Sequence, residues 1–456
     1  MTVATPQRRQ TTTVGSVRAT LQLWRLLRRR NAGHSDPQGL TEGLAILAFA
    51  VSTAVLLLVL GGFMAFLARS QAPGADPDTA FYVLLAGIAS GLLLVPILTL
   101  GGAAARLAMA RRDERLAALR LAGATTGQVG LLTVLDAGRQ ALLGALAGAA
   151  AVLGLIPLVL PLRFQGQGFT YGDLVAPAWV FAATAAVVIL VALVAAAASL
   201  AKVAITPLGV AARHTPRPLH WTRVGPVVAF AVAFAVLIES GRGEIVVLAV
   251  LVVGGLAMIN LVGPWVLGLV GRLSARRART VATLVAARRI IDDPKGAWRS
   301  VGGVALCTFI AGLAAAIAMV DPGPTPDGTQ DPLYADLLTG GFLTLAIAGL
   351  LAAVSTGVMQ AGRIIDQRGQ YRALDLAGTD MQVLHAARLR QTAIPLVAAV
   401  AIATGGALVF MLPGLGFSLL TSLPVLLQFL LSVVGVCALV LAGTLASRPV
   451  VRTVLG

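Results

Sequence analysis

The chain has 456 residues, of which 57% are hydrophobic and only 12% are charged. Because soluble domains carry about 25% charged residues, this composition excludes a soluble globular protein and indicates an integral membrane protein. The formal net charge of +16 does not indicate nucleic-acid binding, since the basic residues lie in short loops between apolar runs rather than in one basic domain. We therefore expect the lipid bilayer as a partner and no nucleic acid.

The N-terminal part precedes the first apolar run. Residues 1–15 are polar, and 16–30 place Val17, Leu21 and Trp24 on one helical face, with arginines gathered near the end. This pattern predicts an amphipathic helix on the cytoplasmic surface of the bilayer; a plain basic anchor is the alternative. No cleavable signal peptide is expected, because the first apolar run is too long for its hydrophobic region.

Ten uncharged apolar runs follow, and about 20 apolar residues cross a bilayer as a helix. The predicted spans are 43–68, 80–105, 140–162, 175–201, 224–241, 245–271, 300–320, 337–361, 392–412 and 423–447. The fifth run is short and ends at Glu239, and the last two are separated where glycines and prolines predict a turn. The fold class is therefore an all-α integral membrane protein with ten transmembrane helices.

The basic residues set the orientation of these spans. With ten spans and a cytoplasmic N-terminus, all but Arg69, Arg163 and Arg242 of the 35 Lys and Arg residues lie on the cytoplasmic side. This distribution follows the positive-inside rule. Both termini are therefore predicted to be cytoplasmic. The loops on the other side are too short to fold a domain.

Short sequences of the first half return, in the same order, in the second half. ATLQLWR at 19–25 resembles ATLVAAR at 282–288, DPQG at 36–39 resembles DPKG at 293–296, and Leu119, Leu121, Ala122 and Gly123 align with Leu374, Leu376, Ala377 and Gly378. This internal duplication predicts two four-span modules in the same orientation, as a parallel repeat.

The predicted division of the chain follows from this repeat. It comprises a cytoplasmic tail with the amphipathic helix (1–39), a first four-span module (40–216), a two-span connector (217–271) and a second four-span module with its own cytoplasmic lead-in helix (272–456).

The sequence contains none of the common motifs for nucleotide binding or metal binding. GxxxxGK[ST], HExxH and CxxC are all absent, so we expect no enzyme, no metal site and no cofactor bound by this chain. Cys307 and Cys437 lie in apolar runs and are expected to be buried hydrophobes. The predicted span interiors hold no ionisable residue, which disfavours an ion-coupled carrier. Asn260 and Gln428 are expected to form hydrogen bonds between helices rather than bind a ligand.

Two charged cytoplasmic segments, 111–126 and 366–381, carry the repeated LxLAG pattern. In the first, a short helix ends at Gly123, and Thr125 or Thr126 caps the next helix. Such a helix–turn–helix offers a rigid contact to a soluble partner, whereas a merely solvated loop would not need the pattern twice. The candidate contact residues are Arg111, Arg112, Glu114, Arg115, Leu119, Gly123, Thr125, Arg368, Gln370, Leu374, Gly378 and Asp380.

LRLAGAT at 119–125, the Gly/Ala-rich run LLGALAGAAAVLGL and ITPLGVAARHTP at 205–216 resemble the FtsX-like permease family of ABC transporters. The resemblance covers both modules. The ten-span plan is similar to the peptide-antibiotic resistance branch, in which one chain holds both modules. Two features differ from the family: Arg115 stands where an acidic residue is usual, and the short loops 69–79 and 321–336 stand where relatives carry a large extracellular domain.

The resemblance implies a bacterial plasma-membrane permease subunit. A separate ATPase dimer, with ATP and Mg on that partner, would push the two coupling segments, and one permease would bind two ATPase copies. The implied substrate is lipophilic or amphipathic (an antibiotic, a peptide or a lipid), as in antibiotic resistance. The alternative is a signalling subunit that relays ATPase motion to a cell-wall partner or a membrane sensor kinase without transport. The sequence identifies no substrate path.

Overall fold

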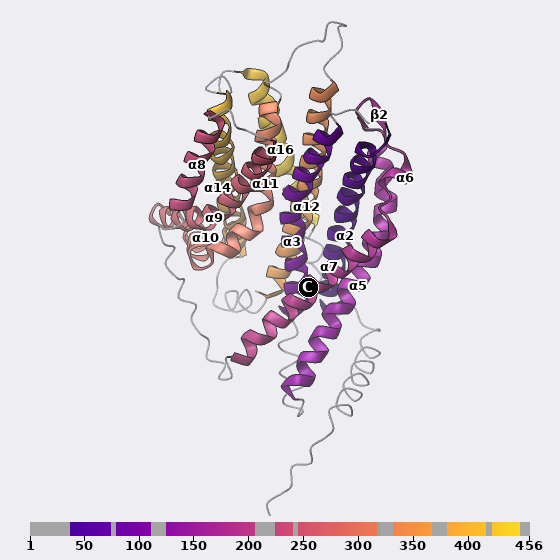
Figure 1. Ribbon diagram of the computed structural model, residues 1–456. Coiled ribbons are helices and arrows are strands. Elements are labelled where there is room, and N and C mark those ends of the chain that lie inside the picture. The colour runs from indigo at the N-terminus through magenta and orange to yellow at the C-terminus, as the bar shows by residue number, and fades with distance from the viewer. Residues whose placement is uncertain are drawn as a thin grey trace, which may run out of the picture.

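Helices dominate the computed structural model (Figure 1), which describes residues 37–73, 79–110, 125–205, 224–239, 245–317, 319, 332–366, 381–415 and 422–446. The helices of the first half are α2 (Pro37–Ser70), α3 (Thr79–Ala110), α5 (Thr126–Val159), α6 (Tyr171–Leu174) and α7 (Ala178–Ile205). Those that follow are α8 (Val224–Glu239), α9 (Ile245–Arg276), α10 (Val281–Asp292), α11 (Pro294–Ile317), α12 (Pro332–Asp366), α14 (Met381–Leu415) and α16 (Leu423–Ala446). Two short strands, β1 (Arg163–Phe164) and β2 (Gln167–Gly168), form a hairpin.

Nine helices in the described part of the chain are long and apolar enough to cross a membrane. In lipid the backbone polar groups must pair internally, which a helix achieves by itself. The predicted fold class is confirmed: the chain is an all-α, multi-pass membrane protein. Helix α8, the fifth predicted span, has 16 residues. At 1.5 Å per residue it is roughly 24 Å long, slightly less than the hydrocarbon thickness of a bilayer.

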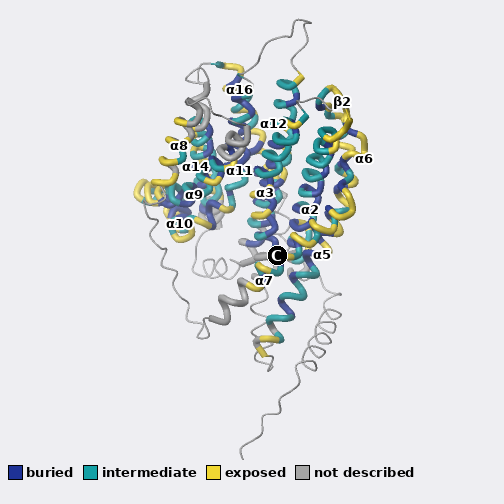
Figure 2. The backbone as a smooth tube through the Cα atoms, viewed as in Figure 1, coloured by how far each residue is buried: buried dark blue, intermediate teal, exposed yellow. Residues whose placement is uncertain are grey.

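The outer surface of the helices is apolar. Leu158, Trp179, Val397 and Leu431 are exposed on α5, α7, α14 and α16. Figure 2 shows exposed positions along the outer sides of α5 and α8 and buried positions toward the middle of the molecule. Large apolar side chains exposed on so many helices match a lipid-facing surface.

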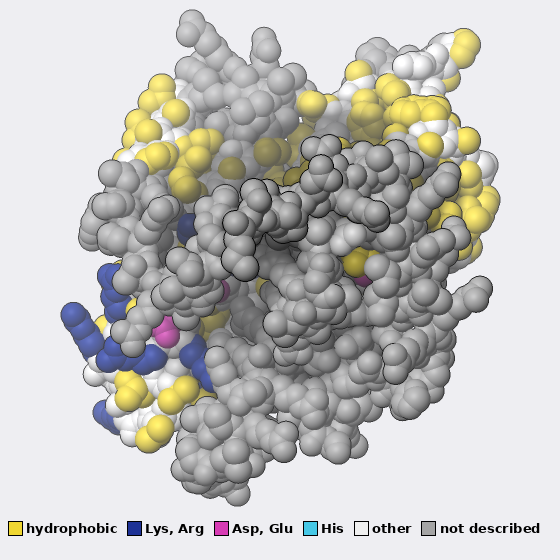
Figure 3. Space-filling view, turned by 90° about the horizontal axis from the view of Figure 1, so that it is seen from below, with side chains coloured by type: hydrophobic (Ala, Val, Ile, Leu, Met, Phe, Trp, Pro, Cys, Tyr) yellow, Lys and Arg dark blue, Asp and Glu magenta, His cyan; other side chains and the backbone are white. Residues whose placement is uncertain are grey.

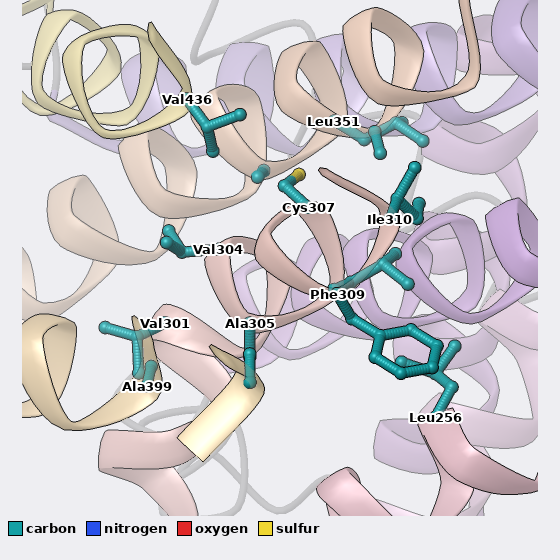
Figure 4. Close-up of a cluster of buried hydrophobic side chains, with 14 of the residues drawn as sticks. Leu256, Val301, Val304, Ala305, Cys307, Phe309, Ile310, Leu351, Ala399 and Val436 are labelled. Carbon is teal, nitrogen blue, oxygen red and sulfur yellow. The ribbon is translucent and has the colours of Figure 1, made fainter. Parts of the chain in front are cut away.

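Helix α11 lies at the centre of the second half. It packs against α9, α12, α14 and α16, and its side chains Val301, Ala305 and Phe309 are almost fully buried (Figure 4). Cys307 is buried among them, and Cys437 packs against the same core. The prediction of a buried hydrophobe is confirmed for Cys307, whereas Cys437 is only partly buried.

The helices of the two halves pack in corresponding ways. Helix α2 contacts α3, α5 and α7, whereas α11 contacts α12, α14 and α16. The α2–α5 contact is close because α5 presents small residues: a Cβ added at Gly148 would lie 2.4 Å from the carbonyl oxygen of Ala50. Small residues allow such close approach of helices in membranes. The two halves meet mainly where α12 contacts α3 and α2.

Helix α10 precedes α11, in the position of the predicted lead-in helix. Thr280 caps its first turn, Ile290 is buried, and Val281 and Leu284 are exposed. Arg390 of α14 donates hydrogen bonds to the hydroxyls of Thr280 and Thr283. The corresponding N-terminal helix predicted at 16–30 lies outside the described residues.

Basic residues gather where α9 ends. Arg272 and Arg276 lie in its last turns, and Arg277 and Arg279 follow before α10. Figure 3, which shows the molecule from below, shows described Lys and Arg side chains together on one part of this face. We call this the inner end, because the predicted orientation places it in the cytoplasm.

Candidate functional site

An apolar cavity of about 240 Å³ lies between the two halves. Its walls come from α2 and α3 of the first half and from α11 and α12 of the second. Aliphatic residues and glycines form much of the lining, which also contains five aromatic residues: Phe63, Phe66, Tyr82, Phe164 and Phe169. The sequence indicated no substrate path, and this cavity is the structure's candidate for one.

The β-hairpin covers the end of the cavity opposite to the inner end. Its strands pair Phe164 with Gln167, so that Gln165 and Gly166 form a two-residue loop. Both loop residues have positive φ angles, 58° and 69°, as a type I′ turn requires. Glycine adopts such angles freely, whereas Gln165 does so at a cost of about 1 kcal/mol.

Arg69 at the end of α2 anchors this hairpin. Its guanidinium donates hydrogen bonds to the carbonyl oxygens of Phe164 (3.1 Å) and Gly168 (2.8 Å). The same guanidinium lies 4.5 Å from the centroid of the Phe169 ring, a cation–π contact. The hairpin is therefore held on the first half of the chain.

Phe66 is the centre of the aromatic cluster. Its ring stacks on Tyr82 at 6.1 Å and meets the rings of Phe164 and Phe169 edge-on, each at 5.5 Å. Stacked and edge-to-face arrangements are the favourable ones for aromatic rings. The cluster fixes α2, α3 and the hairpin relative to one another at this end.

Asp336 connects this cluster to the second half. One of its oxygens, Oδ2, accepts hydrogen bonds from the hydroxyl of Tyr82 (2.8 Å) and from the backbone N–H of Gln165 (2.7 Å). The residue is 8% exposed. A buried carboxylate thus joins α3, the hairpin and α12 at the end of the cavity that the hairpin covers.

Sequence reasoning missed both Asp336 and the hairpin. The eighth span was predicted at 337–361, but α12 begins at Pro332, so the prediction excluded Asp336 from the helix. Proline is favoured in the first helical turn, and this signal would have extended the span. The loop 163–174 was expected only to be short; Gly166 and Gly168 were the local signals of a turn there.

The helices extend beyond the predicted spans and carry ionisable residues in those extensions. The third span was predicted to begin at residue 140, but α5 begins at Thr126 and carries Asp136 and Arg139 in its inner part. Arg139 forms an ion pair with Glu42 of α2. Helices extend past their uncharged runs because pairing near the helix ends stabilises charged groups there.

Of the predicted coupling residues, Thr125 is the one that the structure describes. It is the N-cap of α5, one of the two residues predicted for this role: its hydroxyl accepts from the N–H of Gln128, and the Gln128 side chain accepts from the N–H of Thr125. This reciprocal pair is a capping box. The other candidates, Arg111, Arg112, Glu114, Arg115, Leu119, Gly123, Arg368, Gln370, Leu374, Gly378 and Asp380, lie outside the described residues.

A helix next to each predicted coupling segment is bonded to another helix. Segment 111–126 connects α3 to α5, and α5 is tied to the start of α2 by the Arg139–Glu42 pair. Segment 366–381 connects α12 to α14, and Gln360 of α12 donates a 3.2 Å hydrogen bond to the hydroxyl of Thr392 on α14. The cavity, the hairpin and Asp336 lie at the end opposite to the inner end.

The two amides singled out in the sequence lie on α9 and α16. Asn260 Oδ1 accepts a 3.1 Å hydrogen bond from Nε1 of Trp298 on α11, so its predicted role between helices is confirmed. Gln428 is half-buried and has no hydrogen-bond partner among the described residues. No group of three or more His, Cys, Asp or Glu side chains in the described ranges could hold a metal ion.

Residues 87–208 match a family model described as FtsX-like permease C-terminal. The matched region begins within α3, ends just after α7 and includes the first predicted coupling segment. No curated protein and no solved structure matches the chain. An FtsX-like permease domain implies the permease subunit of an ABC transporter, typically a non-catalytic transmembrane subunit that works with an ABC ATPase. The resemblance inferred from the sequence is confirmed for these residues, and its extension to the second module stays a prediction.

Proposed function

From the FtsX-like permease domain at residues 87–208, we propose that this chain couples a separate ATPase dimer to the movement of a lipophilic or amphipathic compound across or out of a bacterial plasma membrane. The ATPase would bind ATP and Mg, and this chain would bind neither. One chain would hold both permease modules and contact two ATPase copies. Compounds of this class include antibiotics, peptides and lipids, which connects the proposal to antibiotic resistance.

The proposed coupling segments are 111–126 and 366–381. The capping box at Thr125 supports this role, because it fixes the start of α5 directly after the first segment. The Arg139–Glu42 ion pair would pass a displacement of α5 to α2, which forms one wall of the cavity. Coupling between distant sites requires such chains of packed and bonded elements.

The cavity supports the proposed class of substrate. Its apolar wall suits a hydrocarbon body, and ligand sites typically combine such walls with a few polar groups. Because its walls come from both halves, a movement of one half against the other would change its shape. This arrangement suits a transporter, in which one repeat moves against another around a central site.

The proposed modules are 40–216 and 272–456, joined by the connector 217–271. The corresponding packing of α2 and α11 supports a parallel repeat, since α2 packs against α3, α5 and α7 as α11 packs against α12, α14 and α16. In the connector, α8 packs against α14, and α9 packs more extensively against α11 and α14 than against α3 of the first module. We therefore expect the connector to move with the second module.

The coupling role is tested by substitution in the first segment. The full chain, affinity-purified from its native membranes, should bring an ABC ATPase with it. Leu119→Asp and Gly123→Asp should release or uncouple that ATPase while insertion into the membrane stays intact. Unchanged co-purification and unchanged ATPase stimulation in both variants would refute the coupling role.

The transport role is tested in vesicles that contain the chain and its ATPase. Gly62 lines the cavity, and a Cβ added there would meet no atom within 4 Å. Gly62→Leu should therefore fill the cavity and abolish ATP-driven flux of a fluorescent lipophilic probe without displacing the ATPase. Gly154→Leu is the matched control, because Gly154 on α5 is equally open but lies outside the cavity lining. ATP hydrolysis without any flux would exclude the transporter and favour the signalling subunit.

A further inference from the structure

The cavity between the halves carries a charge. Asp336 is the charged residue among the described side chains that line it, and the rest of the lining is almost wholly apolar. We infer that this cavity binds a lipophilic cation, with the carboxylate of Asp336 as its counter-ion and the apolar walls around its hydrocarbon body. This inference rests on the proposed function in taking the cavity as the substrate site.

The hydrogen bonds of Asp336 leave its negative charge uncompensated. Both donors, the Tyr82 hydroxyl and the Gln165 N–H, are neutral, and both bind the same oxygen, Oδ2. Asp336 forms no ion pair within the described part of the chain. Arg69 is engaged with two hairpin carbonyls and the Phe169 ring instead.

A buried charge without a counter-charge is costly, above all in a membrane. A cation that enters the cavity would offset part of this cost, whereas a neutral molecule would not. The carboxylate of Asp336 would instead repel an anion in the cavity. The negative charge of Asp336 therefore favours lipophilic cations over neutral lipophiles and lipophilic anions.

The aromatic residues favour the same ligand. The faces of Phe and Tyr rings attract cations, and Phe63, Phe66 and Tyr82 line the same cavity as Asp336. The chain itself uses this chemistry nearby, where the Arg69 guanidinium lies over the ring of Phe169.

The remaining lining distinguishes a lipophilic cation from a metal ion. Calcium takes six to eight oxygen ligands, and magnesium about six. Here one carboxylate faces walls of leucine, isoleucine and glycine. A cavity of about 240 Å³ with such walls suits an organic cation whose charge sits on an apolar body.

The test measures binding of tetraphenylphosphonium to the full chain in phosphatidylcholine nanodiscs, without ATPase or nucleotide, after subtraction of empty nanodiscs. Tetraphenylborate, an anion of similar size and shape, serves as the comparison. The wild-type chain should bind the cation saturably. Asp336→Asn should lower its affinity about tenfold or more and should not weaken binding of the anion.

Asp336→Asn keeps an oxygen that can accept from Tyr82 and Gln165, so it removes the charge and preserves the contact between the halves. Two further variants, Tyr82→Phe and Gly62→Leu, test whether the charge and the cavity cause the binding. Tyr82→Phe removes one hydrogen bond and keeps the charge, and it should bind the cation at least as well as the wild type. Gly62→Leu should abolish binding by filling the cavity.

Three results would overturn the inference: no saturable binding to the wild type, equal affinity in Asp336→Asn, or a loss in Tyr82→Phe as large as that in Asp336→Asn. Its failure is separable from that of the proposed function. ATP-driven flux of a neutral lipophile without cation binding would refute the inference alone. Cation binding without ATP-driven flux of any probe would leave the site standing and refute the transporter.

Discussion

The backbone N–H of Gln165 donates a 2.7 Å hydrogen bond to Oδ2 of Asp336. Gln165 lies in the left-handed turn of the hairpin after α5, and Asp336 lies in the first turns of α12. Because the hairpin is held by Arg69 on α2, this bond joins the two halves of the chain at the end of the cavity that the hairpin covers. A separation of the hairpin from α12 would break this bond.

Removal of the acceptor should destabilise this junction. Asp336→Ala leaves the Tyr82 hydroxyl and the Gln165 N–H without their partner, and buried unpaired donors cost about 1–3 kcal/mol. We expect a lower midpoint of thermal unfolding in detergent. Asp336→Asn, which keeps an acceptor oxygen, should lose clearly less; equal losses would show that these hydrogen bonds do not stabilise the fold.

The hairpin turn should depend on Gly166. Its φ of 69° lies in the left-handed region, where a β-branched residue costs about 1–2 kcal/mol. Gly166→Val should therefore speed proteolytic cleavage of the hairpin in the full chain. Gly168→Val is the control, since Gly168 has open space around its Cα and is not at a positive φ. Identical cleavage rates for both variants would contradict the assigned turn.

The α2–α5 contact should not accept a larger residue. A Cβ at Gly148 would lie 2.4 Å from the carbonyl oxygen of Ala50 and 2.7 Å from Cβ of Thr53. Gly148→Leu should separate the helices at a cost of about 1–3 kcal/mol, measured as a lower unfolding midpoint in detergent. Gly154→Leu, on the same helix with no atom within 4 Å, should be close to neutral.

The capping box at Thr125 should protect the start of α5. Thr125→Ala removes the acceptor for the N–H of Gln128, at a cost of about 1 kcal/mol. Hydrogen exchange in the first turn of α5 should become faster. Thr170→Ala, which removes the capping box of α6 at the other end of the bundle, should leave exchange in α5 unchanged; faster exchange in both would point to a global effect.

Asn260 and Trp298 should stabilise the contact between α9 and α11. Their 3.1 Å hydrogen bond is of a kind that contributes about 0.6 kcal/mol on average in membrane proteins and about 1.7 at most. A double-mutant cycle with Asn260→Ala and Trp298→Phe, read from unfolding midpoints, should give a coupling energy in this range. Strictly additive losses would show that the hydrogen bond contributes nothing.

The sequence by itself determined the fold class and most of the spans, and it placed the N-cap of α5 at Thr125 or Thr126. Uncharged apolar runs predict membrane helices because the bilayer imposes a minimum length, and a cap depends on residues three apart. The family pattern around 119–125 is equally local, and the family match at 87–208 includes it.

Only the tertiary structure decided where the candidate site lies. Tyr82, Gln165 and Asp336 come from three distant parts of the chain, and no local pattern connects a loop residue to the first turns of a helix so far away. The spans were predicted from uncharged runs, and such a run ends at the first charged residue. The eighth predicted span therefore excluded Asp336. In the folded protein that charge is instead held by two neutral donors at one end of an apolar cavity. The packing of α2 and α3 against α12 brings these groups together, and packing is a property of the whole chain.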